Sequence, residues 1–411
     1  MRRITVIGAT LTGNKGAASM LIALVQNLKK VLIGDYIINC LTIYGESDRQ
    51  FNSYKNLEII KCTPFDIVCI AMPLSIFFYL FKWFNLVKKI LLKNRVIKII
   101  YNSDLVVNIA GISYSDGRGL ILLYNIACDL TPLLLQRKVF KYSQAIGPFK
   151  KLSNRVSARI ILPKIIKIAA RGEETVKNLQ GLGLHNYEHC ADGAFSMSID
   201  KANITDEMIS ICDKIKNLDR INIGIAPSSV VEQYCSRLNI SYKDLLADFI
   251  ERMAKEEKFK LVLFPHCALA NRKTKKNNDL WIVRGIFEKV SAKKSIMYLD
   301  KEYSAEDLRY LISCFDVLIT SRYHGMVTAL SAEVVPLVIG WSHKYTETLN
   351  QFSLAGLCID YSSLNIDLLE NKFLNTINSL QLYKKKISSR LPEVKDASFR
   401  NFTIIRELLG P

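Results

Sequence analysis

The sequence is poor in the residues and spacings that mark several classes of protein. Its 411 residues include only 19 Gly and 10 Pro, far too few for a collagen-like or linker-type chain. The ten cysteines are scattered, with no C-x-x-C pair and no Cys/His cluster at zinc-ligand spacing. We therefore expect free thiols, a reducing compartment and no metal site.

Long apolar runs are also missing. The start, Met1-Arg2-Arg3 followed by ITVIGAT, has too short an apolar core for a signal peptide, and we expect a buried first strand instead. The uncharged run Ile67–Phe81 has 15 residues, whereas a membrane-spanning helix needs about 20. The sequence predicts a cytoplasmic chain.

Acidic residues are absent from two stretches, Ile67–Ser103 and Leu130–Gly172. The first contains six basic residues and the second ten, so together they supply 16 of the formal net charge of +18. A high charge invites a nucleic-acid partner. We do not expect one, because both stretches are rich in Ile and Leu and no nucleic-acid module is recognisable.

The first acid-free stretch has the composition of a membrane-contact segment. The apolar run Ile67–Phe81 leads into KWFNLVKKILLKNRVIKII, which is basic and amphipathic and has Trp and Phe at its head. An interfacial helix on anionic lipid has this composition. We predict a peripheral contact with the inner face of the plasma membrane; the alternative is a buried helix pair that covers a sheet.

Short β-branched runs alternate with helical patterns along the chain, which predicts an α/β fold with parallel sheets. The pattern begins at Ile4 and restarts at Ile221 after a polar stretch. We expect two Rossmann-like domains that face one another, residues 1–205 and 206–411, with a membrane-contact insertion near 67–100. The last helix, around Ala397–Leu409, is expected to pack back on the first domain. We expect strands in the runs 4–9, 104–111, 141–147, 166–172, 221–227, 259–266, 294–300, 315–325 and 336–341.

Small polar residues follow several of these strands. Ligands bind at the carboxyl ends of parallel strands, and a Gly-rich turn before a helix offers N–H groups to an anion. Simple turns are the alternative in each case. The candidate residues are Asn14, Lys15, Gly16, Ser113, Asp116, Gln144 and Arg171.

The segment Ile319–Leu349 contains the strongest candidates for catalytic and binding residues. Arg322 and His324 fall just past an apolar strand, and Lys344 follows the next strand on the same edge of the sheet. Arg binds carboxylate or phosphate bidentately, and His exchanges protons near neutral pH. These basic groups predict an anionic substrate; a structural His with a surface Arg is the alternative.

The ordered motifs of residues 4–355 resemble the polysaccharide pyruvyl transferase family. The string Ser321-Arg322-x-His324-Gly325, an alanine-containing helix, Pro336 and Lys344 is similar to the family signature. The segments GNKGAASM, NIAGISYSD, QAIGPF, RGEETVKNLQGLG, CADGAF and FPHCALANRKTKKNND resemble further family elements in the same order.

The resemblance implies a GT-B-like fold and transfer of pyruvate from phosphoenolpyruvate, a co-substrate, to a sugar or lipid-linked oligosaccharide as a ketal, with no cofactor. It implies that His324 is the acid/base and that Arg322 acts in catalysis and donor binding. Lys344, Ser321 and His266 are implied on the donor side. The acceptor or cleft residues implied are Asn14, Lys15, Gly16, Ser113, Asp116, Gln144 and Arg171.

Two positions differ from the family pattern. Many relatives have Gly-Asp where this chain has Gly16-Ala17, and many have an Arg near the position of Ala226–Ser229. Two alternatives therefore stay open: a GT-B glycosyltransferase with a nucleotide-sugar donor, and a non-enzymatic member of a polysaccharide assembly.

Overall fold

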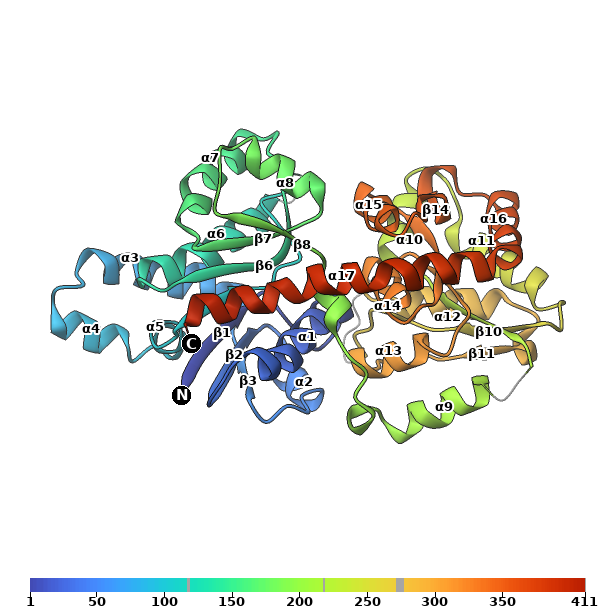
Figure 1. Cartoon of the computed structure of the whole chain (residues 1–411), viewed down its shortest axis with the longest axis horizontal. Helices are drawn as coiled ribbons and strands as arrows, with labels where there is room; N and C mark the ends of the chain where they lie inside the picture. Colours follow the sequence, from blue (N-terminus) through green and yellow to red (C-terminus); the bar gives the residue numbers. More distant parts are fainter. Residues whose placement is uncertain (117–118, 217–218, 271–276, 411) are drawn as a thin grey trace. The chain divides into compact units, whose positions relative to one another are not determined.

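The computed structural model describes residues 1–116, 119–216, 219–270 and 277–410. The chain forms two compact units (Figure 1). Unit 1 comprises Met1–Leu11, Met20–Met197 and Asp396–Pro411, and unit 2 comprises Thr12–Ser19 and Ser198–Lys395. The boundary thus lies at Ser198 rather than after residue 205. Residues 117–118 and 271–276, which fall in two of the predicted loops, lie outside the described residues.

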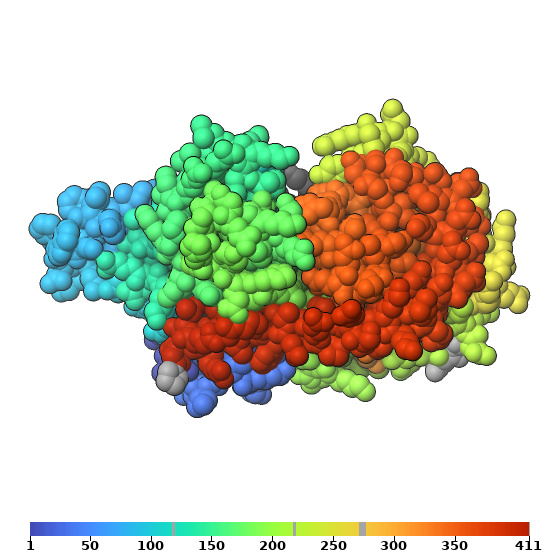
Figure 2. All heavy atoms as spheres, turned by 45° about the horizontal axis from the view of Figure 1, so that its top comes forward, coloured from blue at the N-terminus to red at the C-terminus, as the bar shows by residue number. Residues whose placement is uncertain are grey.

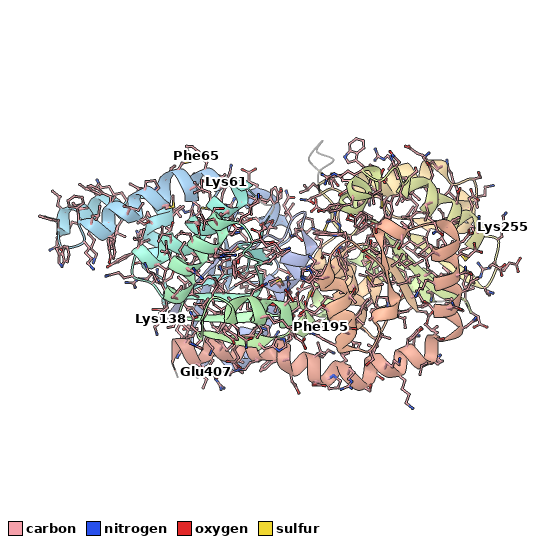
Figure 3. The ribbon with its side chains drawn as sticks, turned by 90° about the horizontal axis from the view of Figure 1, so that it is seen from above. Lys61, Phe65, Lys138, Phe195, Lys255 and Glu407 are labelled. Atoms are coloured by element: carbon pink, nitrogen blue, oxygen red, sulfur yellow. The ribbon has the colours of Figure 1, made fainter. Side chains whose placement is uncertain are left out.

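The end of the chain belongs to unit 1 rather than to the second domain. Helix α17, Leu380–Leu409, carries buried Ser398 and Asn401, which donate hydrogen bonds to the carbonyls of Asp192 (2.8 Å) and Ala191 (3.1 Å). Lys138, labelled near Glu407 in Figure 3, donates to the carbonyl of Leu408 at 2.9 Å. These bonds explain why residues after Lys395 cluster with unit 1.

Unit 1 contains a parallel sheet in the order β3-β2-β1-β4-β6-β7-β8, with β5 paired to β6. Its strands are buried nearly throughout, as expected when helices cover both faces of a parallel sheet. The strands are β1 Arg2–Ile7, β2 Tyr36–Thr42, β3 Leu57–Lys61, β4 Leu105–Asn108, β5 Ile112–Ser113, β6 Val139–Ile146, β7 Lys167–Arg171 and β8 Tyr187–Cys190.

Helices connect the strands of unit 1, and α1 is apolar on nearly every side and correspondingly buried. The helices are α1 Lys15–Val31, α2 Gly45–Gln50, α3 Met72–Leu80, α4 Asn85–Leu91, α5 Arg95–Tyr101, α6 Gly119–Leu134, α7 Leu152–Ile161 and α8 Glu173–Gln180. The predicted insertion is a π-helical turn, Asp66–Ala71, followed by α3, α4 and α5. Among the described residues, no helix combines the length and hydropathy needed to cross a bilayer.

Unit 2 contains a second parallel sheet, in the order β11-β10-β9-β12-β13-β14. Both Rossmann-like units and both parallel sheets were predicted, and they are confirmed. The strands are β9 Ile221–Ala226, β10 Phe259–Leu263, β11 Ile296–Tyr298, β12 Val317–Thr320, β13 Val335–Gly340 and β14 Cys358–Asp360. The helices are α9 Asp206–Lys216, α10 Ser229–Ser236, α11 Tyr242–Met253, α12 Leu280–Lys289, α13 Ala305–Ile312, α14 Tyr323–Ser331, α15 His343–Gln351 and α16 Ile366–Asn378.

Candidate active site

The strand order of unit 2 reverses between β9 and β12, and this point organises the candidate site. Chain connections leave β9 and β12 in opposite directions, so the loops after them part and leave a place for a ligand. Helix α10 begins at Ser229 after β9, and α14 begins at Tyr323 after β12. Two helix N-termini, each a source of N–H donors and positive potential, therefore lie at one edge of the sheet.

Arg322 is fixed at this edge by Asp279. The Nε of Arg322 donates to Oδ2 of Asp279 at 2.9 Å, and Nη2 contacts Oδ1 of the same carboxylate. Nη2 also donates to Oγ of Ser229 at 3.2 Å, which ties the start of α14 to the start of α10. Asp279 is fully buried and accepts the N–H groups of Ser229 and Cys267, both at 2.9 Å. The guanidinium is thus preorganised, and Asp279 balances its charge.

His266 follows β10 and is buried beside the same loops. A Cβ on Gly325 would lie 3.4 Å from Cδ2 of His266, so the imidazole packs against the first turn of α14. Burial, together with the smaller effects of the charges of Arg322, His324 and Lys15, lowers the pKa of His266 to about 3. His266 is therefore a neutral hydrogen-bonding group at physiological pH.

His324, in the first turn of α14, lies directly against the loop Thr12–Ser19. An added Cβ on Gly16 would collide with Nδ1 of the His324 ring. Gly13 in the same loop has a φ of +73°, and its Cβ would approach Leu269 to 2.7 Å, so glycine is required there too. The structure thus brings together His324, which was predicted to be catalytic, and Gly16, which was predicted as an acceptor or cleft residue of the first domain.

Glu302 holds this loop in unit 2. Its Oε1 accepts hydrogen bonds from the ammonium of Lys15 at 2.9 Å and from the N–H of Gly13 at 3.0 Å. Its Oε2 accepts a hydrogen bond from the N–H of Ala270 at 3.1 Å. A β-bridge between Gly13 and Ala268 completes the attachment. Asn14, the exposed neighbour, accepts the N–H of Gly16 at 3.2 Å and helps to begin α1. Sequence reasoning missed Glu302, because a lone acid in a loop carries no motif.

Lys344 lies in the first turn of α15, after β13. Its ammonium is 4.8 Å from the ring centre of Tyr323 and 5.2 Å from that of Trp341, which are cation–π distances. Ser321 is buried, and its hydroxyl lies 2.6 Å from that of Tyr242. Ser321 therefore contacts the core, whereas Lys344 stands at a helix N-terminus that favours an anion.

The site residues predicted in unit 1 lie within or just after its strands β5, β6 and β7, and each is hydrogen-bonded within the unit. Ser113 donates to Gln144 at 2.7 Å, and both side chains are fully buried. Arg171 forms a buried ion pair with Asp192 at 2.5 Å. Asp116 accepts the N–H groups of Lys150 (2.7 Å) and Lys151 (3.1 Å) and the amide of Asn154 (2.6 Å). Their role toward an acceptor remains a prediction.

A family model for the polysaccharide pyruvyl transferases matches residues 14–343. The chain belongs to the polysaccharide pyruvyl transferase family. The match contains the Arg322–His324 segment, the loop of Gly16 and the strand-end residues of unit 1. No curated protein sequence matches the chain significantly.

Solved structures with low sequence identity show that this family member has a GT-B-type fold. The UDP-GlcNAc 2-epimerase of Neisseria meningitidis, solved with UDP-GlcNAc, has a TM-score of 0.64 at 14% identity, covering 100% of this chain and 99% of that chain. Staphylococcus aureus MnaA, solved with UDP, has a TM-score of 0.61 at 16% identity, with coverages of 100% and 97%. Acinetobacter baumannii MurG has a TM-score of 0.50 at 12% identity, with coverages of 99% and 100%.

Metal ligands do not cluster in the part of the chain that the structure describes: no group of three or more His, Cys, Asp or Glu side chains is placed to hold an ion there. The ten cysteines are free thiols, and nine of them are buried or partly buried.

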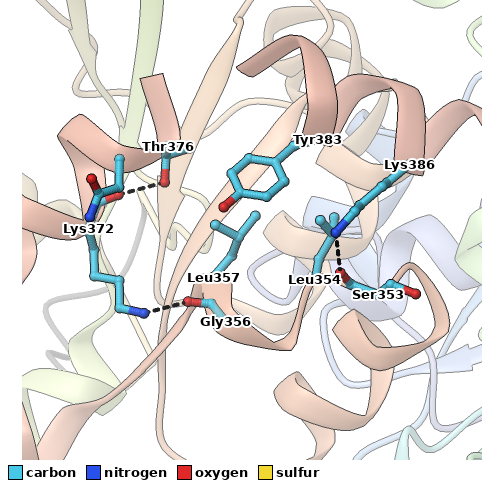
Figure 4. Close-up of a pocket in the computed structure, with 9 residues that line it drawn as sticks. Ser353, Leu354, Gly356, Leu357, Lys372, Thr376, Tyr383 and Lys386 are labelled. Atoms are coloured by element: carbon cyan, nitrogen blue, oxygen red, sulfur yellow. Dashed lines mark hydrogen bonds between the residues drawn. The ribbon is translucent and has the colours of Figure 1, made fainter. Parts of the chain in front are cut away.

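A cavity of about 310 Å³ lies elsewhere in unit 2, among α16, α17 and the loop around Gly356 (Figure 4). Its two lysines point at backbone carbonyls: Lys372 donates to Gly356 at 2.9 Å and Lys386 to Ser353 at 3.4 Å. None of the family-motif residues lines this cavity. It is distinct from the candidate active site.

Proposed function

We propose that this family member transfers pyruvate from phosphoenolpyruvate to a sugar of a cell-surface polysaccharide precursor and forms a pyruvate ketal. The observation that supports this most is the placement of Arg322, His324 and Lys344 at helix N-termini on one sheet edge of unit 2. Phosphoenolpyruvate carries a carboxylate and a phosphate, and cations at helix N-termini bind such groups. Phosphoenolpyruvate is a co-substrate here, and the proposal uses no cofactor.

The proposed reaction balances without a redox step. The methylene carbon of phosphoenolpyruvate gains a proton and becomes a methyl group, which makes the adjacent carbon electrophilic. One sugar hydroxyl adds to that carbon, the bond to phosphate oxygen breaks, and phosphate leaves. A second hydroxyl then closes the ketal. One hydroxyl proton balances the proton taken up by carbon, and the other leaves with phosphate.

His324 is the proposed acid/base of this sequence. Its ring is held against the backbone of Gly16, so proton transfer occurs at a fixed position. Arg322 is the proposed catalytic electrostatic group, since a guanidinium already oriented by Asp279 loses little freedom when an anion binds. Ser321, Lys344 and neutral His266 complete the proposed donor side.

The acceptor is proposed to be a sugar or a lipid-linked oligosaccharide. Within unit 2, Asn14, Lys15 and Gly16 are the candidate acceptor residues that the family resemblance implies. Within unit 1, the resemblance implies Ser113, Asp116, Gln144 and Arg171. Lipid-linked precursors are presented at membranes, so we place the chain in the cytoplasm at the inner face of the plasma membrane. Nucleic acid is not a proposed partner.

A nucleotide-sugar donor is the second candidate. The first strand of unit 2 ends in Ala226-Pro227-Ser228-Ser229, without the Arg of many relatives. In addition, Tyr234 stacks on Trp341 with ring centres 5.3 Å apart, next to Lys344. Flat aromatic faces beside a cation suit a nucleobase with its phosphates.

A donor screen by thermal unfolding separates the candidates. Ligand at 100 times its Kd stabilises the folded state by about 2.7 kcal/mol. We expect phosphoenolpyruvate to raise the Tm and UDP to leave it unchanged, with the shift reduced in Lys344→Gln and retained in the control Lys385→Gln, an exposed lysine of α17. The opposite pattern favours a nucleotide-sugar donor, and no shift with either favours the non-enzymatic alternative.

A further inference from the structure

Unit 1 carries a helical hairpin that projects from the rest of its fold. Helices α3 and α4 run out and back with the turn Phe81–Phe84 between them (Figure 1). Figure 2 shows the hairpin as a lobe at the edge of unit 1. Phe78 of α3 is buried and its ring lies 5.5 Å from that of Tyr101 in α5, and α3 also packs against α6, so this side of the hairpin is anchored on unit 1.

The other sides of the hairpin expose large apolar side chains. Trp83 is 79% exposed and Leu86 is 71% exposed. Contiguous exposed apolar patches mark interaction sites, whereas single exposed apolar residues are ordinary. The exposed set on the hairpin is Ile76, Phe77, Tyr79, Leu80, Phe81, Trp83, Phe84, Leu86 and Ile90.

Basic side chains accompany this apolar surface, and acids do not. From Ile67 to Ser103 the chain has six Lys and Arg residues and no Asp or Glu. The ammonium of Lys82 lies 5.0 Å from the ring centre of Tyr79 and 5.3 Å from that of Trp83. Aromatic rings next to lysine are typical of the boundary between lipid headgroups and acyl chains.

Helix α7 of the same unit repeats the pattern. Leu152, Val156 and Ile160 recur every four residues along one side of this helix, and all three are exposed. Lys151, Arg155 and Arg159 flank them, and they too are exposed. Helix α6 packs against both α3 and α7 and exposes Ile121 and Leu123, so the apolar residues belong to neighbouring helices.

We propose that unit 1 binds an anionic lipid bilayer by inserting the turn Phe81–Phe84 into the boundary between headgroups and acyl chains. The lysines of the hairpin contact lipid phosphates, and α7 lies on the surface beside it. A second copy of the chain fits less well, because two surfaces of the same positive charge repel. The proposal rests on the proposed location at a membrane and names the surface that makes the contact. Its test uses neither the pyruvate donor nor the sugar acceptor, so its result is separate from that of the proposed reaction.

Sedimentation with vesicles tests the binding. Vesicles of phosphatidylcholine with phosphatidylglycerol should bind the native chain, and vesicles of phosphatidylcholine alone should bind it much less. In Trp83→Ser/Phe84→Ser, and in Lys88→Glu/Lys89→Glu/Lys93→Glu, the lipid concentration for half-maximal binding should rise about tenfold or more. Matched controls in unit 2 change exposed residues of the same kinds and should bind as the native chain does: Leu238→Ser/Leu382→Ser and Lys255→Glu/Lys294→Glu/Lys385→Glu.

Quenching by brominated lipid tests insertion of the turn itself. Bromine on the upper acyl chain should quench tryptophan fluorescence of the native chain on anionic vesicles. Trp83→Phe keeps an apolar aromatic side chain, so the variant should still sediment with vesicles but lose most of this quenching. Binding that survives both hairpin variants, or a native chain that does not bind, overturns the proposal. Equilibrium ultracentrifugation that shows a dimer dissociated by Trp83→Ser/Phe84→Ser assigns the hairpin to a second copy instead.

Discussion

The ammonium of Lys15 lies 2.9 Å from the carboxylate of Glu302, a residue 287 positions further along the chain. Both side chains are buried, with 1% and 8% exposed. The same carboxylate accepts the N–H groups of Gly13 and Ala270. One acidic side chain therefore holds the loop Thr12–Ser19 in unit 2, where that loop lies against His324.

Removing Glu302 should destabilise unit 2 strongly. Glu302→Ala leaves the buried ammonium of Lys15 without this carboxylate, and breaking a buried ion pair costs about 3–5 kcal/mol. Urea unfolding followed by a probe in unit 2 measures the change. Glu207→Ala is the control, because its pair with Lys301 is about half exposed and should contribute less than about 1 kcal/mol. Similar losses in the two variants contradict this account of Glu302.

Gly16→Ala should damage the site directly. The new methyl group collides with the His324 ring, so either the ring or the loop must move. Overpacking of this kind costs about 1–3 kcal/mol. We expect a lower unfolding free energy and a loss of catalytic turnover, both measured on the purified variant. Gly356→Ala, whose Cβ meets nothing within 4 Å, should leave both quantities near native values. A fully active Gly16→Ala variant counts against the assigned position of His324.

Asp279 should be needed for stability and for donor binding. Asp279→Ala leaves the guanidinium of Arg322 without its carboxylate partner and two buried N–H groups without their acceptor. We expect a loss of about 3–5 kcal/mol in urea unfolding. Asp279→Asn keeps an oxygen acceptor and should fold better, yet bind phosphoenolpyruvate more weakly in calorimetry because Arg322 loses its orientation. Native affinity in the Asn variant is the contrary outcome.

His266 should make the stability of unit 2 depend on pH. Its folded pKa of about 3 lies below the usual 6.5, so between these values the unfolded chain binds a proton that the folded chain does not. Stability from this group is therefore lost as the pH falls below about 6.5. From pH 7 to pH 5.5 the native chain should lose ~1 kcal/mol more than His266→Asn. If the unfolding free energies of the two proteins depend on pH in the same way, the low pKa assigned to His266 is disproved.

Most of the fold could be predicted from the sequence because the core strands of both sheets are continuous apolar runs. β1, β4, β9 and β12 all lie in segments that the pattern identified. β8 and β14 did not stand out, since they are short strands at sheet edges with partly exposed residues. β2 and β3 were also missed, although both are largely buried.

The insertion was predicted only in part. Its composition indicated lipid contact, but a basic amphipathic stretch gives no sign of where a helix reverses. The structure places the reversal at Phe81–Phe84, and Asn94 ends the second helical segment by capping α5.

The candidate site, too, could be predicted from the sequence only in part. Arg322, His324 and Gly16 could be found because each follows a strand in a recognisable loop. Glu302 could not, because its role depends on a contact with Lys15 that only the folded chain creates. The sequence predicted Arg322 as a cation of the site but not its ion pair with Asp279, which positions the guanidinium.

Release of phosphate from phosphoenolpyruvate in the presence and absence of a polysaccharide precursor tests the central claim most directly. The account predicts release that requires the acceptor, falls to background in His324→Asn, and is unaffected in His185→Asn, an exposed histidine of unit 1. Full activity in His324→Asn, or phosphate release that is indifferent to acceptor, would contradict it.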